Sequence, residues 1–122
     1  MPAWLSDPMA FDDLELARIQ RAVGGLCEKR SPPPHLRHEL SVEYRVEGHA
    51  ITVFERRPKW RGQGVTEGGV ARLRFIRQAG EWRLFWRRAD LKWHSYSPLP
   101  SSTDLSDLVA EIQADPHACF FG

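Results

Sequence analysis

Residues 71–96, ARLRFIRQAGEWRLFWRRADLKWHSY, decide the fold because apolar and polar side chains alternate along three successive segments. A period of two is typical of a strand that buries one face. Short breaks, QAG at 78–80 and AD at 89–90, separate the segments, and connections this short join antiparallel neighbours. We therefore expect three consecutive strands of an antiparallel meander.

The same alternation runs through residues 40–47, and Gly48-His49 predicts a tight turn into a second strand. Residues 58–69, PKWRGQGVTEGG, contain four glycines and predict a loop. Together with the segments downstream, these strands predict a five-stranded antiparallel meander over residues 40–97.

Apolar residues at helical spacing flank this sheet on both sides. Asp7-Pro8 is typical of a helix start, which predicts a helix over residues 8–29, and a second helix is predicted over 103–114. The two apolar stripes consist of Leu16, Ile19, Val23 and Leu26, and of Leu105, Leu108, Val109 and Ile112. We expect one α+β domain over 1–122, with both helices packed on one face of the sheet.

The composition is that of a globular protein with a tryptophan-rich core. The chain has 122 residues and a mass of 14.0 kDa, and it contains five tryptophans. Its two cysteines match no disulfide framework, and its first residues do not resemble a secretory signal. No apolar run approaches the ~20 residues of a membrane span. These features predict a cytoplasmic protein with no membrane partner.

Charge is unevenly distributed along the chain. Residues 36–97 carry 13 basic and 7 acidic side chains, a net charge of +6, whereas residues 98–122 carry four acidic and no basic ones. A basic central region favours an anionic partner.

Hairpin geometry predicts which residues share a face. If Ala89-Asp90 is a two-residue turn, Trp86 faces Trp93 on the side that the helices cover. Basic and aromatic residues are then expected on the opposite face. They are Arg45, Arg56, Arg72, Arg74, Arg83, Arg87 and Lys92, with Phe54, Phe85, His94 and Tyr96.

Such a face suits single-stranded nucleic acid or another polyanion, since cations neutralise phosphates and rings stack on bases. The alternative is a solvated sheet face on which arginine stems cover the rings. The predicted binding residues are Arg72, Arg74, Arg83, Phe85, Arg87, Lys92, His94 and Tyr96, with Lys59, Trp60 and Arg61 at the tip of the glycine-rich loop.

A second hypothesis is a small hydrolase or metal-assisted enzyme that uses Glu55, His94, His117 and Cys119. Each of these residues also has a structural interpretation, such as a Glu55 ion pair with Arg57. No cofactor is expected, because the glycine-rich loop does not match a phosphate-binding loop. No metal is expected at the H-x-x-H of residues 35–38, because no further ligand lies at a recognisable spacing.

The C-terminal sequence ADPHACFFG, residues 114–122, places two phenylalanines beside a thiol where chain ends are usually polar. We expect residues 115–122 to dock on the core, with Cys119 as a packing residue. A third hypothesis is that this tail or an edge strand contacts another protein, so that the chain forms a homo-oligomer or a complex.

The segments ERRPKW, ARLRF, WRLFWRRADLKWHSY and DPHACFFG together resemble the bacterial family called domain of unknown function 3024. The matching residues are Glu55, Arg57, Pro58, Trp82, Trp86, Asp90, Trp93, His94, Tyr96, Asp115, Pro116, Cys119, Phe120 and Gly122. The resemblance covers most of the chain. It implies a small bacterial protein and brings no activity with it. Phe121 stands where the family often has tryptophan, which keeps the aromatic character.

Overall fold

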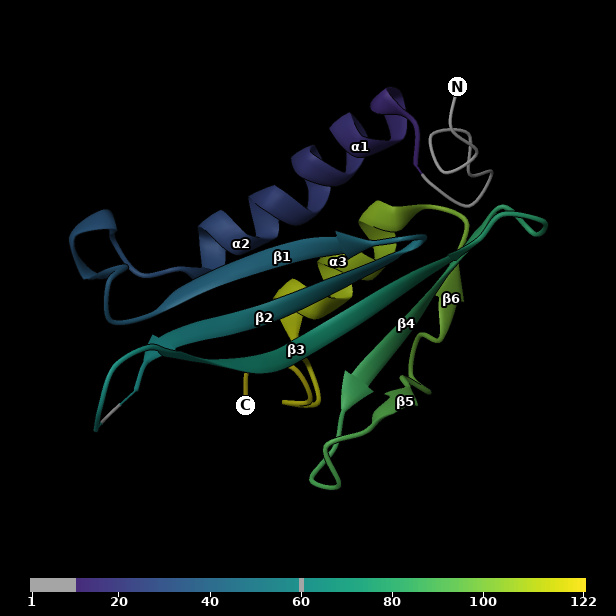
Figure 1. The fold of residues 1–122 in the computed structure, drawn as a ribbon. Coiled ribbons are helices and arrows are strands. Elements are labelled where there is room, and N and C mark those ends of the chain that lie inside the picture. Colours follow the sequence, from purple (N-terminus) through teal and green to yellow (C-terminus); the bar gives the residue numbers. More distant parts are fainter. Residues whose placement is uncertain (1–10, 60) are drawn as a thin grey trace.

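The computed structural model describes residues 11–59 and 61–122, and its elements are shown in Figure 1. The first helical segment runs without a break through α1 (Asp13–Ile19), the π turn η2 (Gln20–Gly24) and α2 (Gly25–Arg30). Asp12 caps α1, because its carboxylate accepts from the Glu15 amide while the Glu15 carboxylate accepts from the Asp12 amide. The predicted helix start at Asp7-Pro8 lies outside the described residues.

A six-stranded antiparallel sheet follows a single turn of 3₁₀ helix at Pro34–Leu36. The strands are β1 (Ser41–Glu47), β2 (Ala50–Pro58), β3 (Val65–Ile76), β4 (Glu81–Arg87), β5 (Trp93–Ser95) and β6 (Ser101–Ser102). The sheet order is β1-β2-β3-β4-β5, which confirms the predicted meander, and β6 adds a short pairing with β4. The last helix, α3 (Leu105–Ala114), is capped by Asp104.

The predicted loop over residues 58–69 is much shorter in the structure. β2 continues to Pro58 and β3 begins at Val65, so only residues 59–64 connect them. Gly68 and Gly69 therefore belong to a strand, where the pairing of β2 with β3 outweighs their weak strand propensity.

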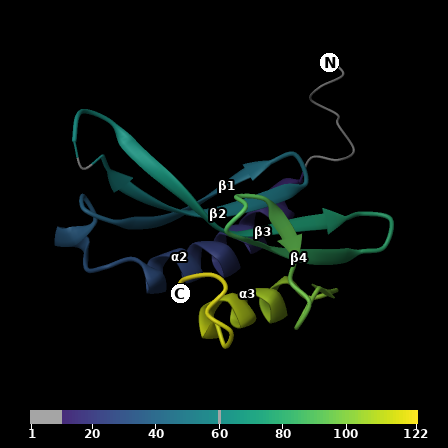
Figure 2. The ribbon, with the colours of Figure 1, turned by 90° about the horizontal axis from the view of Figure 1, so that it is seen from below.

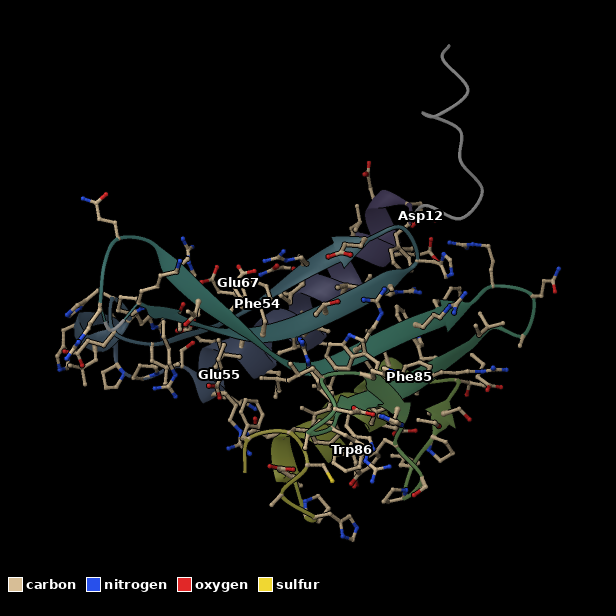
Figure 3. All side chains as sticks on the ribbon, turned by 60° about the horizontal axis from the view of Figure 1, so that its bottom comes forward. Asp12, Phe54, Glu55, Glu67, Phe85 and Trp86 are labelled. Carbon is tan, nitrogen blue, oxygen red and sulfur yellow. The ribbon has the colours of Figure 1, made fainter. Side chains whose placement is uncertain are left out.

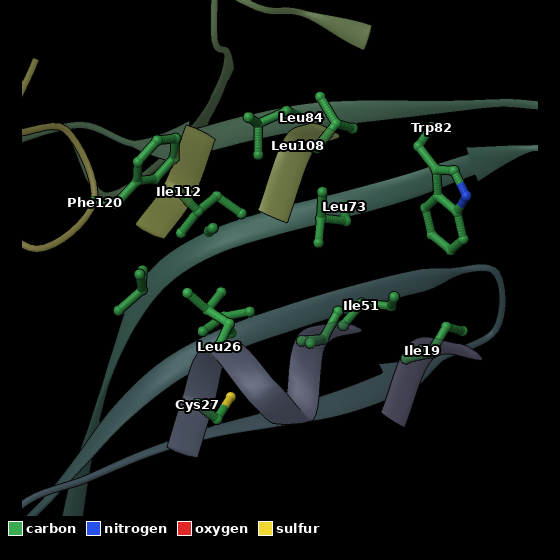
Figure 4. Close-up of a cluster of buried hydrophobic side chains, with 14 of the residues drawn as sticks. Ile19, Leu26, Cys27, Ile51, Leu73, Trp82, Leu84, Leu108, Ile112 and Phe120 are labelled. Carbon is green, nitrogen blue, oxygen red and sulfur yellow. The ribbon is translucent and has the colours of Figure 1, made fainter. Parts of the chain in front are cut away.

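Both helical segments cover the same face of the sheet, as Figure 2 shows for α2 and α3. The core between the two layers contains nearly inaccessible aliphatic side chains from both helices and from three strands (Figure 4). They include Ile19, Val23, Leu26, Leu108 and Ile112 from the helices, and Ile51, Val53, Leu73 and Leu84 from the sheet. At one end of this core, Phe11 stacks on Trp82 with ring centroids 5.6 Å apart.

One residue of the predicted helical stripe lies outside the core. Leu16 is 38% exposed, whereas Ile19 is 1% exposed. Both residues lie in α1, ahead of the π turn η2, so Leu16 faces solvent although its spacing from Ile19 is helical.

The C-terminal tail lies against the core. Asp115 ends α3 in the left-handed conformation (φ +44°), and its carboxylate accepts hydrogen bonds from the amides of Phe120 (3.0 Å) and Phe121 (2.9 Å). The Phe120 ring is 7% exposed and packs on Tyr96, with centroids 4.9 Å apart. The Arg30 guanidinium covers the Phe121 ring at 4.2 Å. Both phenylalanines are therefore engaged by their own chain.

Candidate functional site

The connection between β4 and β5 determines which residues lie on the face of the sheet away from the helices, called here the open face. Trp86 pairs with His94 and Arg87 pairs with Trp93, so the predicted pairing of Trp86 with Trp93 is wrong. The turn is longer than two residues, because the Arg88 amide donates to the Lys92 carbonyl at 3.2 Å. A one-residue change in register moves every side chain of a strand to the other face.

The prediction that His94 and Tyr96 lie on the open face is therefore wrong. Tyr96 is 1% exposed in the core, and its hydroxyl donates to Glu111 Oε2 at 2.5 Å. Burial, followed by the hydrogen bond to Glu111, raises the pKa of Tyr96. His94 lies on the helix side, where its Nε2 is 2.8 Å from Asp90 Oδ2. Lys92, a third predicted contact, lies exposed in the β4–β5 turn.

Trp93 lies on the open face, where His94 and Tyr96 were predicted to lie. It joins Phe54 and Phe85, which Figure 3 labels on strands in front of the helices. Phe54 is only 7% exposed and lies 4.3 Å beneath the Arg45 guanidinium. Phe85 and Trp93 are half-buried. The open face thus offers two partly accessible rings.

Trp93 reaches across the sheet to β3. A Cβ atom on Gly69 would lie 2.9 Å from two carbons of the Trp93 ring and 3.1 Å from Arg87 Cδ. Only a glycine leaves room for both side chains at this point. A bulge at Val70 brings Gly69 to the open face together with Arg72, because Phe54 pairs with Gly69 and Val53 pairs with Ala71.

The cations of the open face fall into two groups. Arg45, Arg56 and Arg83 each face a carboxylate, at 2.6 Å from Glu67, 3.9 Å from Glu43 and 3.6 Å from Glu81. Glu67 was not predicted to lie here, because residues 58–69 were predicted to form a loop. In the structure β3 begins at Val65, and the bulge at Val70 turns Glu67 to the open face.

The second group consists of Arg72, Arg74 and Arg87, and none of the three has a carboxylate partner within residues 11–59 and 61–122. Arg72 donates to Thr52 Oγ1 and Arg74 donates to His49 Nε2, each at 3.3 Å. Arg87 has a buried Nε with no hydrogen-bond partner, and its guanidinium carbon is 5.9 Å from the Trp93 ring centroid. These three arginines carry the uncompensated positive charge of the open face.

A hollow of about 190 Å³ is lined by the aromatic rings of Phe54 and Trp93 and by two of these arginines, Arg72 and Arg87. We call it the Trp93 hollow. Its lining consists of Arg45, Glu47, Thr52, Phe54, Glu67, Gly69, Arg72, Arg87 and Trp93. It therefore combines two uncompensated arginines with an aromatic wall.

The predicted loop tip is separate from this hollow. Lys59 and Arg61 are exposed in the β2–β3 connection, whose ends are joined by a 3.1 Å hydrogen bond from the Lys59 amide to the Gly64 carbonyl. Neither residue lines the Trp93 hollow. Trp60, the third predicted residue of the tip, lies outside the described residues.

The residues of the enzymatic hypothesis have separate partners in the structure. Glu55 pairs with Arg57 at 3.3 Å, His94 with Asp90, and the Cys119 thiol lies 3.7 Å from the His117 carbonyl. Burial, with a smaller contribution from the Asp115 carboxylate, raises the pKa of Cys119, which is the opposite of nucleophile activation. Across the described ranges, no group of three metal-ligating side chains is close enough to hold an ion.

Two other cavities lie on the helix side of the molecule. The larger, about 600 Å³, is bounded by α1, η2, the β3–β4 hairpin and the start of α3, and its walls are mainly apolar. The other, about 380 Å³, lies between the first helical segment and β1, beside Cys27. Burial raises the pKa of the Cys27 thiol to about 12, so that this group stays protonated.

Comparison with known proteins identifies a family. A family model described as "Domain of unknown function (DUF3024)" matches residues 11–122. No curated protein and no solved structure matches the chain. No helix in the described part of the chain has the length and apolar character needed to cross a membrane.

Proposed function

Because the chain belongs to the DUF3024 family, whose description carries no activity, we propose a function from its own surface. In this proposal the domain binds single-stranded nucleic acid on the β3–β4–β5 part of the open face. The observation that carries the proposal is the group of Arg72, Arg74 and Arg87, which have no carboxylate partner within the described ranges and lie beside partly exposed rings.

Uncompensated arginines favour a polyanion for a simple electrostatic reason. A guanidinium that already faces a carboxylate gains little from a phosphate, whereas an unpaired one displaces the condensed cations of the nucleic acid. Arg45, Arg56 and Arg83 belong to the first kind. The attraction is therefore concentrated toward β3 and β4, close to Phe85 and Trp93.

The aromatic residues favour a single strand over a duplex. In single strands the faces of the bases are accessible and stack on aromatic side chains of a sheet, whereas in a duplex they are covered by neighbouring bases. Phe85 and Trp93 are half-buried and lie on adjacent strands of the open face. Phe54 is already covered by Arg45, so it supports the face without offering a ring.

A solvated face with no ligand is the structural alternative. In that case each arginine should serve to cover an apolar ring or to neutralise an acid. Arg45 does both, since it covers Phe54 and pairs with Glu67. Within the described ranges, Arg72 and Arg74 do neither, and their hydrogen bonds there are to Thr52 and His49. These two side chains favour a ligand over a purely protective role.

The test is a titration of a labelled short single-stranded oligonucleotide with the full chain, followed by fluorescence anisotropy at several salt concentrations. The test variant is Arg72→Gln/Arg74→Gln/Arg87→Gln. The matched control, Arg18→Gln/Arg21→Gln/Lys29→Gln, removes the same charge from exposed positions on the first helical segment. A duplex of the same sequence and a polyphosphate serve as competitors.

We expect the wild-type protein and the control to bind with an affinity that falls steeply with salt. In the test variant the slope of log K against log salt should become shallower by roughly 2, because each lost phosphate contact contributes about 0.7 for single strands. Equal competition by polyphosphate would show that the face binds polyanions without using its rings. Absence of binding at low salt, or equal binding by both triple variants, would refute the proposal.

A further inference from the structure

We infer that the Trp93 hollow is a subsite for one nucleotide unit, with its phosphate between Arg72 and Arg87 and its base against Trp93. This inference rests on the proposed function, because it assigns a particular ligand group to one place on the open face. Four features of the hollow support it. They are the unpartnered Nε of Arg87, the position of Arg72 on the neighbouring strand, the fixed Trp93 ring and the small volume.

Arg87 is the first of these features. Its side chain is half-buried, and its Nε is inaccessible to solvent and has no hydrogen-bond partner among residues 11–59 and 61–122. Buried polar groups in folded proteins are nearly always paired, so an orphan donor calls for an explanation. Turning the Arg87 guanidinium toward a phosphate would break no hydrogen bond that its Nε makes within the described part of the chain.

Arg72 is placed to share that phosphate. It lies directly opposite Phe85 in the β3–β4 pairing, and Arg87 follows two residues after Phe85 on the same face. Diagonal neighbours of this kind are separated by roughly 7–8 Å, a span that two long arginine side chains close around one anion. Arginine forks match the oxygens of a phosphate better than single charges do.

Trp93 supplies the wall for a planar group. Its ring tip occupies the space that a Cβ on Gly69 would fill, so the indole lies close to the backbone of β3. Trp93 as a whole is half-buried, and it lines the hollow. A ring fixed in this way loses little conformational freedom when a base stacks on it.

Acidic residues of the hollow define where the anion lies. Arg45 donates to both oxygens of Glu67, at 2.7 and 2.6 Å, so that carboxylate is neutralised within the lining. Glu47 is exposed on β1, which lies on the far side of β2 from Arg72 and Arg87. A phosphate is therefore attracted to the β3–β4 side and repelled from the β1 side.

The volume limits the ligand to a part of a larger molecule. Pockets that enclose a whole small molecule typically measure about 300–1,000 Å³, and this hollow measures about 190 Å³. It fits one unit of a strand whose neighbours continue over the open face. A free nucleotide should consequently bind more weakly than a strand, at the same place.

The experiment is a titration of the full chain with uridine monophosphate, uridine and inorganic phosphate, each followed by two-dimensional NMR of backbone amides and indole N–H groups. The variants are Arg87→Gln, Arg72→Gln and Trp93→Ala. Lys29→Gln, at an exposed position of α2, is the control for loss of one charge. Each variant is first checked for a wild-type pattern of dispersed signals.

We expect uridine monophosphate to shift the Trp93 indole signal and the amides around Gly69 and Arg87. Arg87→Gln and Arg72→Gln should each weaken its binding at least tenfold, and Trp93→Ala should reduce it to the level of inorganic phosphate. If Arg87→Gln does not fold, Arg87→Lys tests the same point, since it keeps the charge and removes the fork. Lys29→Gln should bind as the wild type does.

Failure of this inference is distinguishable from failure of the proposed function. If oligonucleotides bind through the three arginines but uridine monophosphate shifts signals elsewhere, the nucleotide subsite is wrong and the binding face stands. Equal binding of uridine and uridine monophosphate would overturn the phosphate position, and equal binding of phosphate and uridine monophosphate would overturn the base position. If neither nucleotide nor oligonucleotide binds, both proposals fail.

Discussion

His94 and Asp90 face each other across the β4–β5 turn, with His94 Nε2 2.8 Å from Asp90 Oδ2. The other carboxylate oxygen of Asp90 accepts a 2.9 Å hydrogen bond from the Lys92 amide. A single carboxylate thus joins the turn to the strand that follows it. In the same register, Trp93 rather than His94 lies on the open face.

Stability should depend on pH through Asp90. The Lys92 amide hydrogen bond, followed by the contact with His94 and the nearby charge of Arg88, lowers the pKa of Asp90 below its ordinary value of 3.8. A lowered pKa stabilises the folded protein at pH values above the ordinary pKa of Asp90. This stabilisation disappears as the pH falls through the lowered pKa. Urea unfolding should show wild type more stable than Asp90→Asn near neutral pH, with the gap closing in acid. A gap that stays constant down to the acid transition would contradict this.

Neither tyrosine should ionise at its ordinary pKa in the folded protein. Burial is the main cause that raises the pKa of both Tyr44 and Tyr96 above 10.0, assisted by Cys27 for the first and by Glu111 for the second. The protonated hydroxyls therefore stabilise the folded protein at pH values below the ordinary pKa. This stabilisation is lost as the pH rises through the raised pKa values. We expect the tyrosinate absorbance to rise only above pH about 10 and together with unfolding. Titration of either tyrosine at its ordinary pKa in the folded state would refute the expectation.

Removal of Cys119–Gly122 should destabilise the fold. Burial of the Phe120 ring against Tyr96 is expected to contribute about 2–3 kcal/mol to the free energy of unfolding. Phe120→Ala should reproduce most of the loss, whereas Cys119→Ser, which keeps the tail and its rings, should cost much less. Denaturant unfolding measures all three variants. An unchanged midpoint in the truncated protein would mean that the tail does not dock in solution.

Gly69→Ala tests how the Trp93 ring is seated. The added methyl group would lie 2.9 Å from the ring and 3.1 Å from Arg87 Cδ, so one of the two side chains must move. We expect a loss of about 1 kcal/mol of stability and a shifted indole signal for Trp93.

Gly68→Ala is the matched control for this substitution, because a Cβ there meets nothing within 4 Å. It should change the free energy of unfolding by no more than about 0.5 kcal/mol and leave the Trp93 signal in place. Similar effects of the two substitutions would show that the Trp93 ring does not lie over Gly69.

The prediction that placed His94 and Tyr96 on the open face was wrong for a local reason. Strict alternation places Tyr96 on the open face only if the β4–β5 turn has two residues, and the actual turn is longer, with Leu91 in the left-handed region at φ +63°. A leucine in this conformation is unusual, so the sequence carries no ordinary turn signal there. Glu67 and Gly69 were predicted to belong to a loop and were assigned to neither face. Nothing in the residues around Val70 marks the bulge that turns both of them to the open face.

The elements of the fold were determined by the sequence itself. Period-two alternation, short polar breaks and helical stripes are local properties, so they predict the order helix, five-stranded meander, helix from neighbouring residues alone. The basic character of the open face follows from the same local pattern, since Arg72, Arg74, Arg83 and Arg87 alternate with core residues.

Only the tertiary structure decided which of these arginines are neutralised and which ring stands beside them. Ion pairs such as Arg45 with Glu67 join residues far apart in the chain, and they depend on strand register. Register in turn depends on the bulge at Val70 and on the length of the β4–β5 turn, and a shift of one residue exchanges the two faces. A local pattern states that side chains alternate, whereas the packing of the whole sheet selects the side on which each one lies.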